Sequence, residues 1–328
     1  MPDRDPTSLI GRNLGGRYRL DALAERCPHG VVYAAHDLHS GRPVSVRLLT
    51  GIDPPGPDFE REARRLRALH DTLIARLHAS VRLADGTAGL VMEPMEGERL
   101  RDRMARGVLP VAEALHILDA VLRALEICHV AGIIHRDVRP ENILLDAAGH
   151  PPGEPAVKLH GAGLAQLVDQ RAAGGMLYGH PLFTAPEQWV NRAVDPRADL
   201  YAVALIGHVM LRGRHFIEPG PPLDVCRRHF DAPRPPLHQS GRGEPIPATL
   251  GATLTRSASP RPEDRFPTAE AMRAAIAAAR VELPSRPPLP RQPTGPLPEP
   301  IDPSTRPIRI DADDLHRITA ELAAAFDE

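Results

Sequence analysis

The run HRDVRPENILL at residues 135–145 constrains the fold of this chain more than any other feature. It holds a polar triplet, His-Arg-Asp, followed by Asn142 five residues after the aspartate. An apolar segment, ILL, comes directly afterwards and is typical of a short strand. The triplet alone would be weak evidence, because a loop with a buried histidine can produce it by chance. The fixed offset to the asparagine and the strand behind it indicate a loop that carries chemistry.

The first third of the chain has the pattern of a sheet. Within residues 16–95, the runs GRYRLDAL, GVVYAAHD and PVSVRLLT alternate or run apolar with β-branched residues, which predicts strands. VRLADGTAGLVME predicts a hairpin around Asp85-Gly86. One helix is expected in PDFEREARRLRALH, because Phe59, Ala63 and Leu66 share a face at helical spacing.

The remainder of the chain up to residue 280 has a helical pattern. Apolar residues at helical spacing predict helices, and Pro267-Thr268 is a start signal for the last of them. The expected helices are 111–131, 196–212 and 267–280. No internal repeat is present.

Three segments toward the ends of the chain differ in composition from the rest. Residues 1–15 are polar and predict a flexible N-terminus. Residues 281–306 contain nine prolines and predict a semi-rigid linker. Residues 307–328 hold six acids against two arginines and an apolar stripe typical of an amphipathic helix. This last segment either docks into a groove, on a protein partner or on its own domain, or stays a tail, since isolated helices of this length are marginal in water.

Composition excludes several classes of function. The formal net charge is −2 with scattered basic residues, which argues against a nucleic-acid partner. The three cysteines are far apart in the sequence and make neither a disulfide framework nor a zinc pattern. No run approaches the roughly 18 apolar residues of a membrane span, and the N-terminus lacks the apolar core of a secretion signal. A cytoplasmic protein is therefore expected.

The run at 135–145 resembles the catalytic loop of protein kinases, H-R-D-x-x-x-x-N. The resemblance extends over residues 16–280 and is strongest to bacterial serine/threonine kinases. It implies an α+β, bilobal protein kinase-like fold. A small β-rich N-lobe with one helix would span residues 16–95, and a large, mainly helical C-lobe residues 98–280.

The resemblance also implies roles for individual residues. Asp137 would accept the proton of the substrate hydroxyl, and Asn142 would hold a magnesium ion. Arg139 stands where the family has the catalytic-loop lysine. Glu62 matches the helix glutamate that pairs with a strand lysine, and Arg47 stands at the position of that lysine.

An adenine site is implied between the lobes. LVMEPMEG at 90–97 resembles the hinge, with Met92 as gatekeeper, then Glu93, and Met95 offering its backbone N–H to adenine. The remaining family positions of the nucleotide site are Gly30, Val32 and Leu144, and Ser45 replaces the usual alanine. In the C-lobe, the resemblance pairs Glu187 of TAPEQW with Arg265 and buries Asp199 beneath the catalytic loop.

Several positions depart from the family pattern. The D-F-G element is Gly161-Ala162-Gly163, so the carboxylate that holds magnesium is missing and Asn142 is the sole family metal ligand left. Ala162 also leaves a gap where a phenylalanine would stack on His135 and Leu66. The glycine-rich loop keeps only Gly30 and carries Glu25 and Pro28. His180 stands at the family's threonine, and Tyr178 is the sole hydroxyl residue between residues 164 and 183.

These departures share one task, the positioning of the phosphates of magnesium-bound ATP. They predict a pseudokinase, a kinase-like domain without efficient phosphotransfer that acts as a scaffold or binding module. Two alternatives stay open. One is a weak or unconventional serine/threonine kinase that relies on Asp137 and Asn142. The other is a sensor that binds ATP or another adenine nucleotide without a metal.

Overall fold

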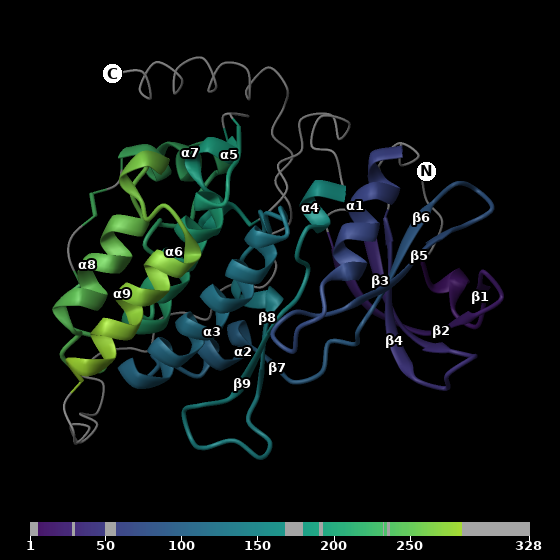
Figure 1. The fold of residues 1–328 in the computed structure, drawn as a ribbon, viewed down its shortest axis with the longest axis horizontal. Coiled ribbons are helices and arrows are strands. Elements are labelled where there is room, and N and C mark those ends of the chain that lie inside the picture. The colour runs from purple at the N-terminus through teal and green to yellow at the C-terminus, as the bar shows by residue number, and fades with distance from the viewer. Residues whose placement is uncertain are drawn as a thin grey trace.

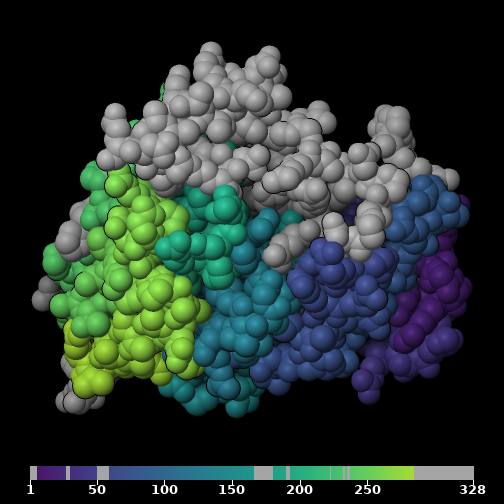
Figure 2. Space-filling model, turned by 45° about the horizontal axis from the view of Figure 1, so that its top comes forward, coloured from purple at the N-terminus to yellow at the C-terminus, as the bar shows by residue number. Residues whose placement is uncertain are grey.

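The computed structural model describes residues 6–27, 30–49, 57–167, 180–189, 193–231, 233–234 and 237–283. A twisted sheet with one helix stands at one end of the molecule, and a group of helices stands at the other (Figure 1). The space-filling view shows the same division, with the early strands and the last helices at opposite ends (Figure 2). The expected bilobal α+β fold is confirmed. Among the described residues, no helix is long and apolar enough to cross a bilayer.

The N-lobe is built on a six-stranded antiparallel sheet in the order β1-β2-β3-β4-β6-β5. Period-two alternation gives the sheet two distinct faces. Val31, Tyr33 and Val46 are buried in a hydrophobic cluster on the outer face of the sheet. Val32 and Arg47 alternate with them along the strands and so belong to the inner face. The strands are β1 Asn13–Leu14, β2 Tyr18–Cys27, β3 Gly30–Asp37, β4 Pro43–Leu49, β5 Leu77–Arg82 and β6 Ala88–Met92.

The N-lobe helix, α1 Pro57–Ala68, covers the sheet with the predicted apolar face. Phe59, Ala63 and Leu66 are all buried. Regular structure occurs within the stretch expected to be a flexible N-terminus. Residues Pro6–Leu9 form a 3-10 turn whose Pro6 carbonyl accepts a hydrogen bond from the Tyr33 hydroxyl (2.9 Å), and β1 pairs with β2.

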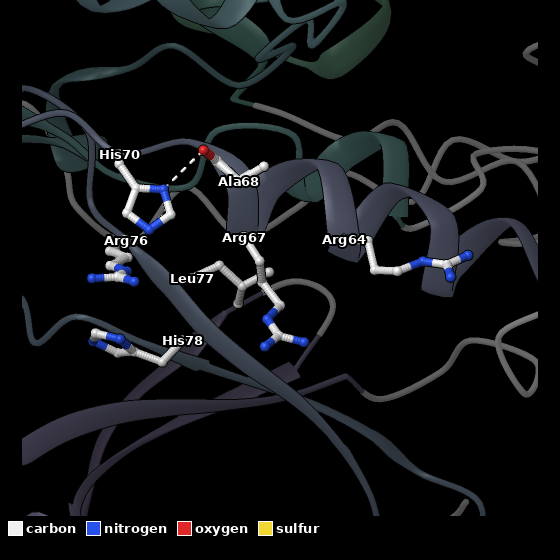
Figure 3. A pocket seen from close by; sticks show the side chains of 7 residues that line it. All are labelled: Arg64, Arg67, Ala68, His70, Arg76, Leu77 and His78. Atoms are coloured by element: carbon white, nitrogen blue, oxygen red, sulfur yellow. Dashed lines mark hydrogen bonds between the residues drawn. The ribbon is translucent and has the colours of Figure 1, made fainter.

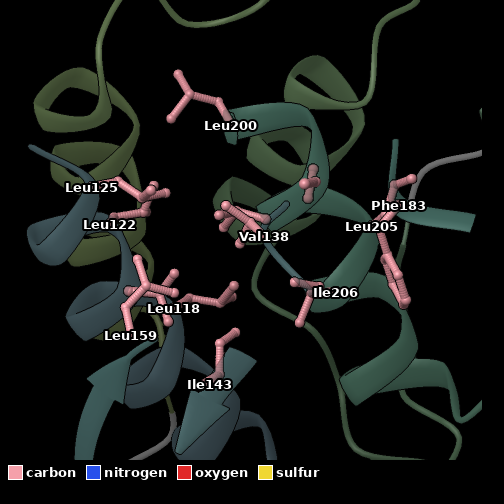
Figure 4. Packing of buried hydrophobic residues seen from close by; sticks show 14 of the residues in the cluster. Leu118, Leu122, Leu125, Val138, Ile143, Leu159, Phe183, Leu200, Leu205 and Ile206 are labelled. Carbon is pink, nitrogen blue, oxygen red and sulfur yellow. The ribbon is translucent and has the colours of Figure 1, made fainter. Parts of the chain in front are cut away.

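The C-lobe is helical around a small three-stranded sheet, β7-β8-β9. The predicted helices are confirmed within one or two residues, and the side chain of Thr268 caps the last one by accepting a hydrogen bond from the backbone N–H of Ala271 (3.1 Å). Leucine, isoleucine and valine side chains from these helices and strands fill the core (Figure 4). The elements are β7 Glu98–Arg99, β8 Ile143–Asp146, β9 Ala156–Leu159, α2 Leu100–Ala105, α3 Val111–Val130, α4 Leu164–Leu167, α5 Pro186–Trp189, α6 Arg197–Arg212, α7 Pro222–Asp231, α8 Ala248–Ser257 and α9 Ala269–Val281.

Some expectations fall outside the described residues. These are the loop tip at Pro28, the stretch with Tyr178, nearly all of the linker and the whole segment 307–328. Helix α9 continues to Val281, the first residue of the expected linker.

A buried ion pair between Glu187 and Arg265 ties the C-lobe together, as the sequence predicts. The two guanidinium nitrogens Nη1 and Nη2 of Arg265 donate to the two carboxylate oxygens at 2.7 and 2.8 Å, and both side chains are almost fully buried. The other N–H groups of Arg265 donate to three backbone carbonyls, so all five of its donors have partners. Those carbonyls belong to Arg197, Ser259 and Pro260.

We therefore predict that Arg265→Met destabilises the domain by about 3–5 kcal/mol, because the substitution leaves a buried carboxylate without its cation and removes a donor from three backbone carbonyls. Urea unfolding followed by far-UV circular dichroism measures the change. Arg19→Ala is the control, because Arg19 pairs with Asp21 at the surface and should cost less than about 1 kcal/mol. Equal losses in the two variants would contradict the role of Arg265.

Candidate active site

The buried carboxylate of Asp199 holds the catalytic loop. It accepts hydrogen bonds from the backbone N–H groups of His135 (2.9 Å) and Arg136 (2.8 Å) and lies 2.8 Å from Nε2 of His129. Burial alone would raise the pKa of Asp199, but these N–H groups and the neighbouring histidines lower it below its ordinary value. The carboxylate therefore stays ionised and fixes two consecutive peptide groups.

The same contacts fix an uncommon backbone conformation. Arg136 has φ +62°, and no other non-glycine residue in the described ranges has a positive φ. His135 is fully buried and neutral, because burial lowers its pKa. Its Nδ1 accepts from the backbone N–H of Asp137 (3.3 Å), and its Nε2 lies 3.1 Å from the carbonyl of His160 and can only donate to it. The side chains of Asp199 and His135 thus anchor the loop through hydrogen bonds to its backbone.

Asp137 and Asn142 lie together, as the sequence predicts. The amide nitrogen of Asn142 donates to the backbone carbonyl of Asp137 (2.8 Å) and to its Oδ2 (3.0 Å). Arg139 adds a cation 3.5 Å from the same Oδ2. The second carboxylate oxygen, Oδ1 of Asp137, is buried and has no hydrogen-bond partner among the described residues. An unpaired acceptor at this place is available to a hydroxyl or water.

His180 is buried near the catalytic loop. Burial, with a further contribution from the nearby Arg139, lowers its pKa to about 4, although the Asp137 charge opposes this. The ring is therefore neutral at pH 7, and its Nδ1 accepts a hydrogen bond from the backbone N–H of Leu182 (3.3 Å). A neutral ring used in this way fixes the turn before α5.

The residues present do not fit a magnesium ion at the family position. Gly161 has φ +86°, and a Cβ built there would lie 3.7 Å from the amide nitrogen of Asn142. A side chain at position 161 would therefore face Asn142, but glycine offers no oxygen ligand. No group of three or more His, Cys, Asp or Glu side chains that could hold a metal occurs in the described ranges. Magnesium needs about six oxygen ligands, largely from carboxylates, phosphates and water.

The small residues after Gly161 let α1 approach closely. A Cβ on Gly163 would lie 2.6 Å from Cδ2 of Leu66 and 3.1 Å from Cγ2 of Ile133. Leu66 therefore packs directly against the backbone of the Gly161-Ala162-Gly163 segment, and Ala162 itself is buried. The expected gap is at least partly taken up by this approach of the helix.

Two charged residues and a valine share the inner face of the N-lobe sheet, which is the roof of the cleft expected between the lobes. Cross-strand register pairs Glu25 with Val32 and Val32 with Arg47, which places the three on the same face of the sheet. Arg47 does not reach Glu62 in an ion pair, although both belong to the described ranges. Glu62 pairs instead with Arg65 (3.2 Å) and Arg61 (3.5 Å) on its own helix. The Nε atom of Arg47 is buried without a hydrogen-bond partner among the described residues.

An ion pair crosses the cleft from roof to floor. The guanidinium of Arg99 donates to both carboxylate oxygens of Glu25, at 2.7 and 3.3 Å. Arg99 lies on β7 beside the hinge, 74 positions along the chain from Glu25 on β2. Burial would raise the pKa of Glu25, but Arg99, with Arg47 and Arg139 nearby, brings it below the ordinary value. The carboxylate is therefore charged and surrounded by cations.

The expected adenine slot has apolar walls. Val32, Met92 and Leu144 are buried, and Gly30 approaches β4 so closely that a Cβ would lie 2.0 Å from the carbonyl oxygen of Leu48. Met95 is half-buried in the hinge. The Glu93 side chain accepts from the backbone N–H of Arg76 (3.1 Å) and pairs with Lys158 on β9.

Sequence reasoning missed His160, which directly precedes the D-F-G position. Its ring is 1% exposed, and neither ring nitrogen has a hydrogen-bond partner among the described residues. Burial and the adjacent Arg47 lower its pKa to about 3, so the ring is neutral. Its identity alone does not single it out in the sequence, because only the burial of the ring is unusual. The role of Arg99 was also not predicted, although a partly buried acid such as Glu25 needs a cation as its partner.

Comparison with known proteins agrees with this geometry. Residues 28–232 match the family model of the protein kinase domain. The chain is 36% identical over 239 residues to the serine/threonine-protein kinase PknA of Mycobacterium tuberculosis, which covers 65% of this chain and 54% of the relative. It is 32% identical over 289 residues to the serine/threonine-protein kinase pkn2 of Myxococcus xanthus, covering 83% of this chain and 34% of the relative.

A third relative, the serine/threonine-protein kinase PksC of Streptomyces coelicolor, is 30% identical over 280 residues, covering 80% of this chain and 49% of the relative. The chain thus spans between a third and about half of the length of these curated relatives. The family model, the bilobal fold and the loop held by Asp199 agree with one another. The chain belongs to the protein kinase family, with bacterial serine/threonine kinases among its relatives.

Proposed function

We propose that this domain is a pseudokinase, a kinase-like module that binds a protein partner and does not transfer phosphate efficiently from ATP. The observation that carries the proposal is Gly161, which faces Asn142 where the family has a metal-binding carboxylate. Magnesium spreads the charge of the transferring phosphate, and losing such a stabilising charge is worth several kcal/mol of barrier. At about 1.4 kcal/mol per tenfold in rate, phosphotransfer should be slower by orders of magnitude.

The cross-cleft pair supports the same proposal. Glu25 places a carboxylate among Arg47, Arg99 and Arg139, the cations that would otherwise face the phosphates of a nucleotide. A nucleotide phosphate would have to displace this carboxylate or lie beside it, and like charges at short range repel. The carboxylate of Glu25 thus pairs with Arg99 and joins the two lobes without a ligand.

The rest of the domain keeps what a binding module needs. Glu187, Arg265 and Asp199 retain all their contacts, so the C-lobe is rigid without catalysis. Asp137 and Asn142 bond to each other and stabilise the loop, which gives both a structural role. A scaffold in the cytoplasm that acts through a protein partner fits these observations.

A second candidate is a sensor that binds an adenine nucleotide or nucleoside without metal. It is favoured by polar atoms in the cleft that lack partners among the described residues, namely Nε of Arg47, Oδ1 of Asp137 and both ring nitrogens of His160. Buried polar atoms without partners are uncommon in native structures and often mark a ligand or water site. The walls formed by Val32, Met92 and Leu144 suit a flat base.

We predict that the purified chain, with radiolabelled ATP and magnesium, transfers no more phosphate to itself or to a general protein substrate than Asp137→Ala does. The reason is the absent carboxylate at position 161. Transfer that disappears in Asp137→Ala would instead support the alternative of a weak serine/threonine kinase.

Restoring the carboxylate tests the metal argument directly. We expect Gly161→Asp to make ATP binding depend on magnesium, with affinity at least about tenfold higher in magnesium than in a chelator, a difference of about 1.4 kcal/mol. Isothermal titration measures it. Gly161→Asn is the matched control, because it has the same shape and the same backbone strain at φ +86° but no charge. The original chain should show no magnesium effect, and equal behaviour of the two variants would contradict the assignment of position 161.

Removing the charge of Glu25 tests the second observation behind the proposal, the ion pair between Glu25 and Arg99. We expect Glu25→Gln to bind ATP about tenfold or more tightly than the original chain, because it removes a carboxylate from among the phosphate-facing cations. Glu98→Gln is the control, since Glu98 belongs to the same strand as Arg99 and pairs with Arg106 (2.8 Å). An unchanged or weaker affinity in Glu25→Gln would show that Glu25 does not block the site.

A further inference from the structure

A pocket of about 740 Å³ opens in the C-lobe where α6 ends, on the side formed by the following loop and α7. Its walls combine arginine and histidine side chains with apolar ones, and Glu218 is the one acid among the lining residues described. They are His208, Arg212, Arg214, His215, Phe216, Glu218, Pro219, Arg228, Pro233 and Leu237. None of the contacts described above for the nucleotide cleft involves these residues, so the pocket is a separate feature.

The arginines give the pocket a positive rim. Arg214 is exposed, and Arg212 makes only a long contact with the carbonyl of Gln239 (3.5 Å). Arg228 braces the loop by donating to the carbonyls of Glu218 (2.8 Å) and Pro219 (3.1 Å) and keeps its full charge, because neutral carbonyls do not neutralise it. Three guanidiniums against one carboxylate favour an acidic ligand.

The base of the pocket is apolar and aromatic. Phe216 meets the ring of His208 edge to face, with centroids 4.7 Å apart, and Leu237 is buried beside them. Burial lowers the pKa of both His208 and His215 to about 4, so neither adds charge at pH 7. Nδ1 of each ring is buried and has no hydrogen-bond partner among the described residues. A ligand for this pocket therefore needs apolar side chains together with a hydrogen-bonding group in its centre and carboxylates at its edge.

A second basic pocket, in the N-lobe, has a different character (Figure 3). It measures about 290 Å³ and lies between the end of α1 and the start of β5. Arg64, Arg67 and Arg76 line it with two histidines, and its apolar lining is limited to Ala68 and Leu77. This site lacks the apolar base of the C-lobe pocket, so a variant of it tests the effect of positive charge alone on the binding of an acidic segment.

We propose that the C-lobe pocket binds the chain's own residues 307–328. This segment lies outside the described residues, and its sequence is the reason for assigning it to the pocket. Six acids against two arginines give it a net charge of about −4, the opposite of the pocket rim. Its stripe of Leu315, Ile318, Leu322 and Phe326 supplies the apolar groups that the base of the pocket requires.

The intervening chain is long enough for this contact. The described structure ends at Leu283, and 23 residues, 284–306, separate it from the acidic segment. A proline-rich stretch of that length reaches on the order of 70 Å at about 3.1 Å per residue. A compact domain of this size has a radius of gyration of only about 19 Å. Tethering also raises the effective concentration of the segment, so that weak contacts suffice.

Docking there would place the segment close to the catalytic loop. The ring of His215 lies 5.6 Å from that of Phe183, and Phe183 lies 5.3 Å from His180. His180 in turn is near Asp137 and Arg139. A docked segment would therefore lie beside the catalytic loop. The proposal does not depend on whether the cleft turns over ATP.

Hydrogen exchange on the full chain tests the proposal. We expect the amides of 307–328 and of the loop 214–218 to be protected. Exchange should become roughly tenfold faster in Arg214→Glu and in the triple variant Asp311→Asn, Asp313→Asn, Asp314→Asn, the factor that corresponds to about 1.4 kcal/mol. Arg214 is exposed, so its replacement should leave the thermal melt unchanged. Protection should also fall in high salt.

Arg67→Glu in the N-lobe pocket is the matched control and should leave the exchange of 307–328 unchanged. Three outcomes would overturn the proposal. The first is exchange of 307–328 at the rate of an unstructured chain. The second is protection that is lost in Arg67→Glu and kept in Arg214→Glu. The third is protection that rises with protein concentration, which would show that the segment docks on a second copy.

Discussion

The buried carboxylate of Asp199 is the contact on which the active-site region depends. Two consecutive backbone N–H groups of the catalytic loop donate to it, and without them the loop would not hold Arg136 at φ +62°. That conformation costs about 1–2 kcal/mol for a residue with a side chain. The loop can therefore keep its shape, and Asp137 its place, for reasons of folding alone. A preserved H-R-D-x-x-x-x-N pattern is for this reason evidence for the fold and much weaker evidence for catalysis.

The cleft differs from the catalytic loop, because its residues depart from the family pattern. Three arginines, Arg47, Arg99 and Arg139, surround Glu25, which substitutes for the negative charge that a nucleotide would bring. The ion pair from Glu25 to Arg99 is formed by two partly buried side chains from different lobes, so it ties the lobes to each other. Under the proposed function, the glycine at position 161 and the carboxylate at position 25 act together: the first offers the metal no ligand, and the second supplies an internal anion.

Much of this could be predicted from the sequence, and the failures have physical causes. Strands and helices follow from periodicity, because local patterns determine them. The pair of Glu187 with Arg265 spans 78 positions and was expected only from the resemblance to protein kinases. The cross-cleft pair does not, since Glu25 and Arg99 are brought together only by the tertiary structure. Nor does the missing contact between Arg47 and Glu62, which depends on how α1 lies against the sheet. His160 escaped notice because its burial, not its identity, makes it unusual.

Buried polar atoms without a hydrogen-bond partner among the described residues occur in the cleft and in the C-lobe pocket, and also at His129 and Glu141 near the catalytic loop. All five donors of Arg265 are satisfied deep in the C-lobe, whereas Arg47, Asp137 and His160 each keep a buried atom without a partner among the described residues. Buried polar groups cost about 1–3 kcal/mol each when unpaired, so a folded chain keeps them only where water or a ligand completes the set. Under the proposed function, the cleft lacks metal chemistry but keeps the features of a binding site, in which an arginine, a carboxylate and a neutral imidazole offer hydrogen bonds to a ligand.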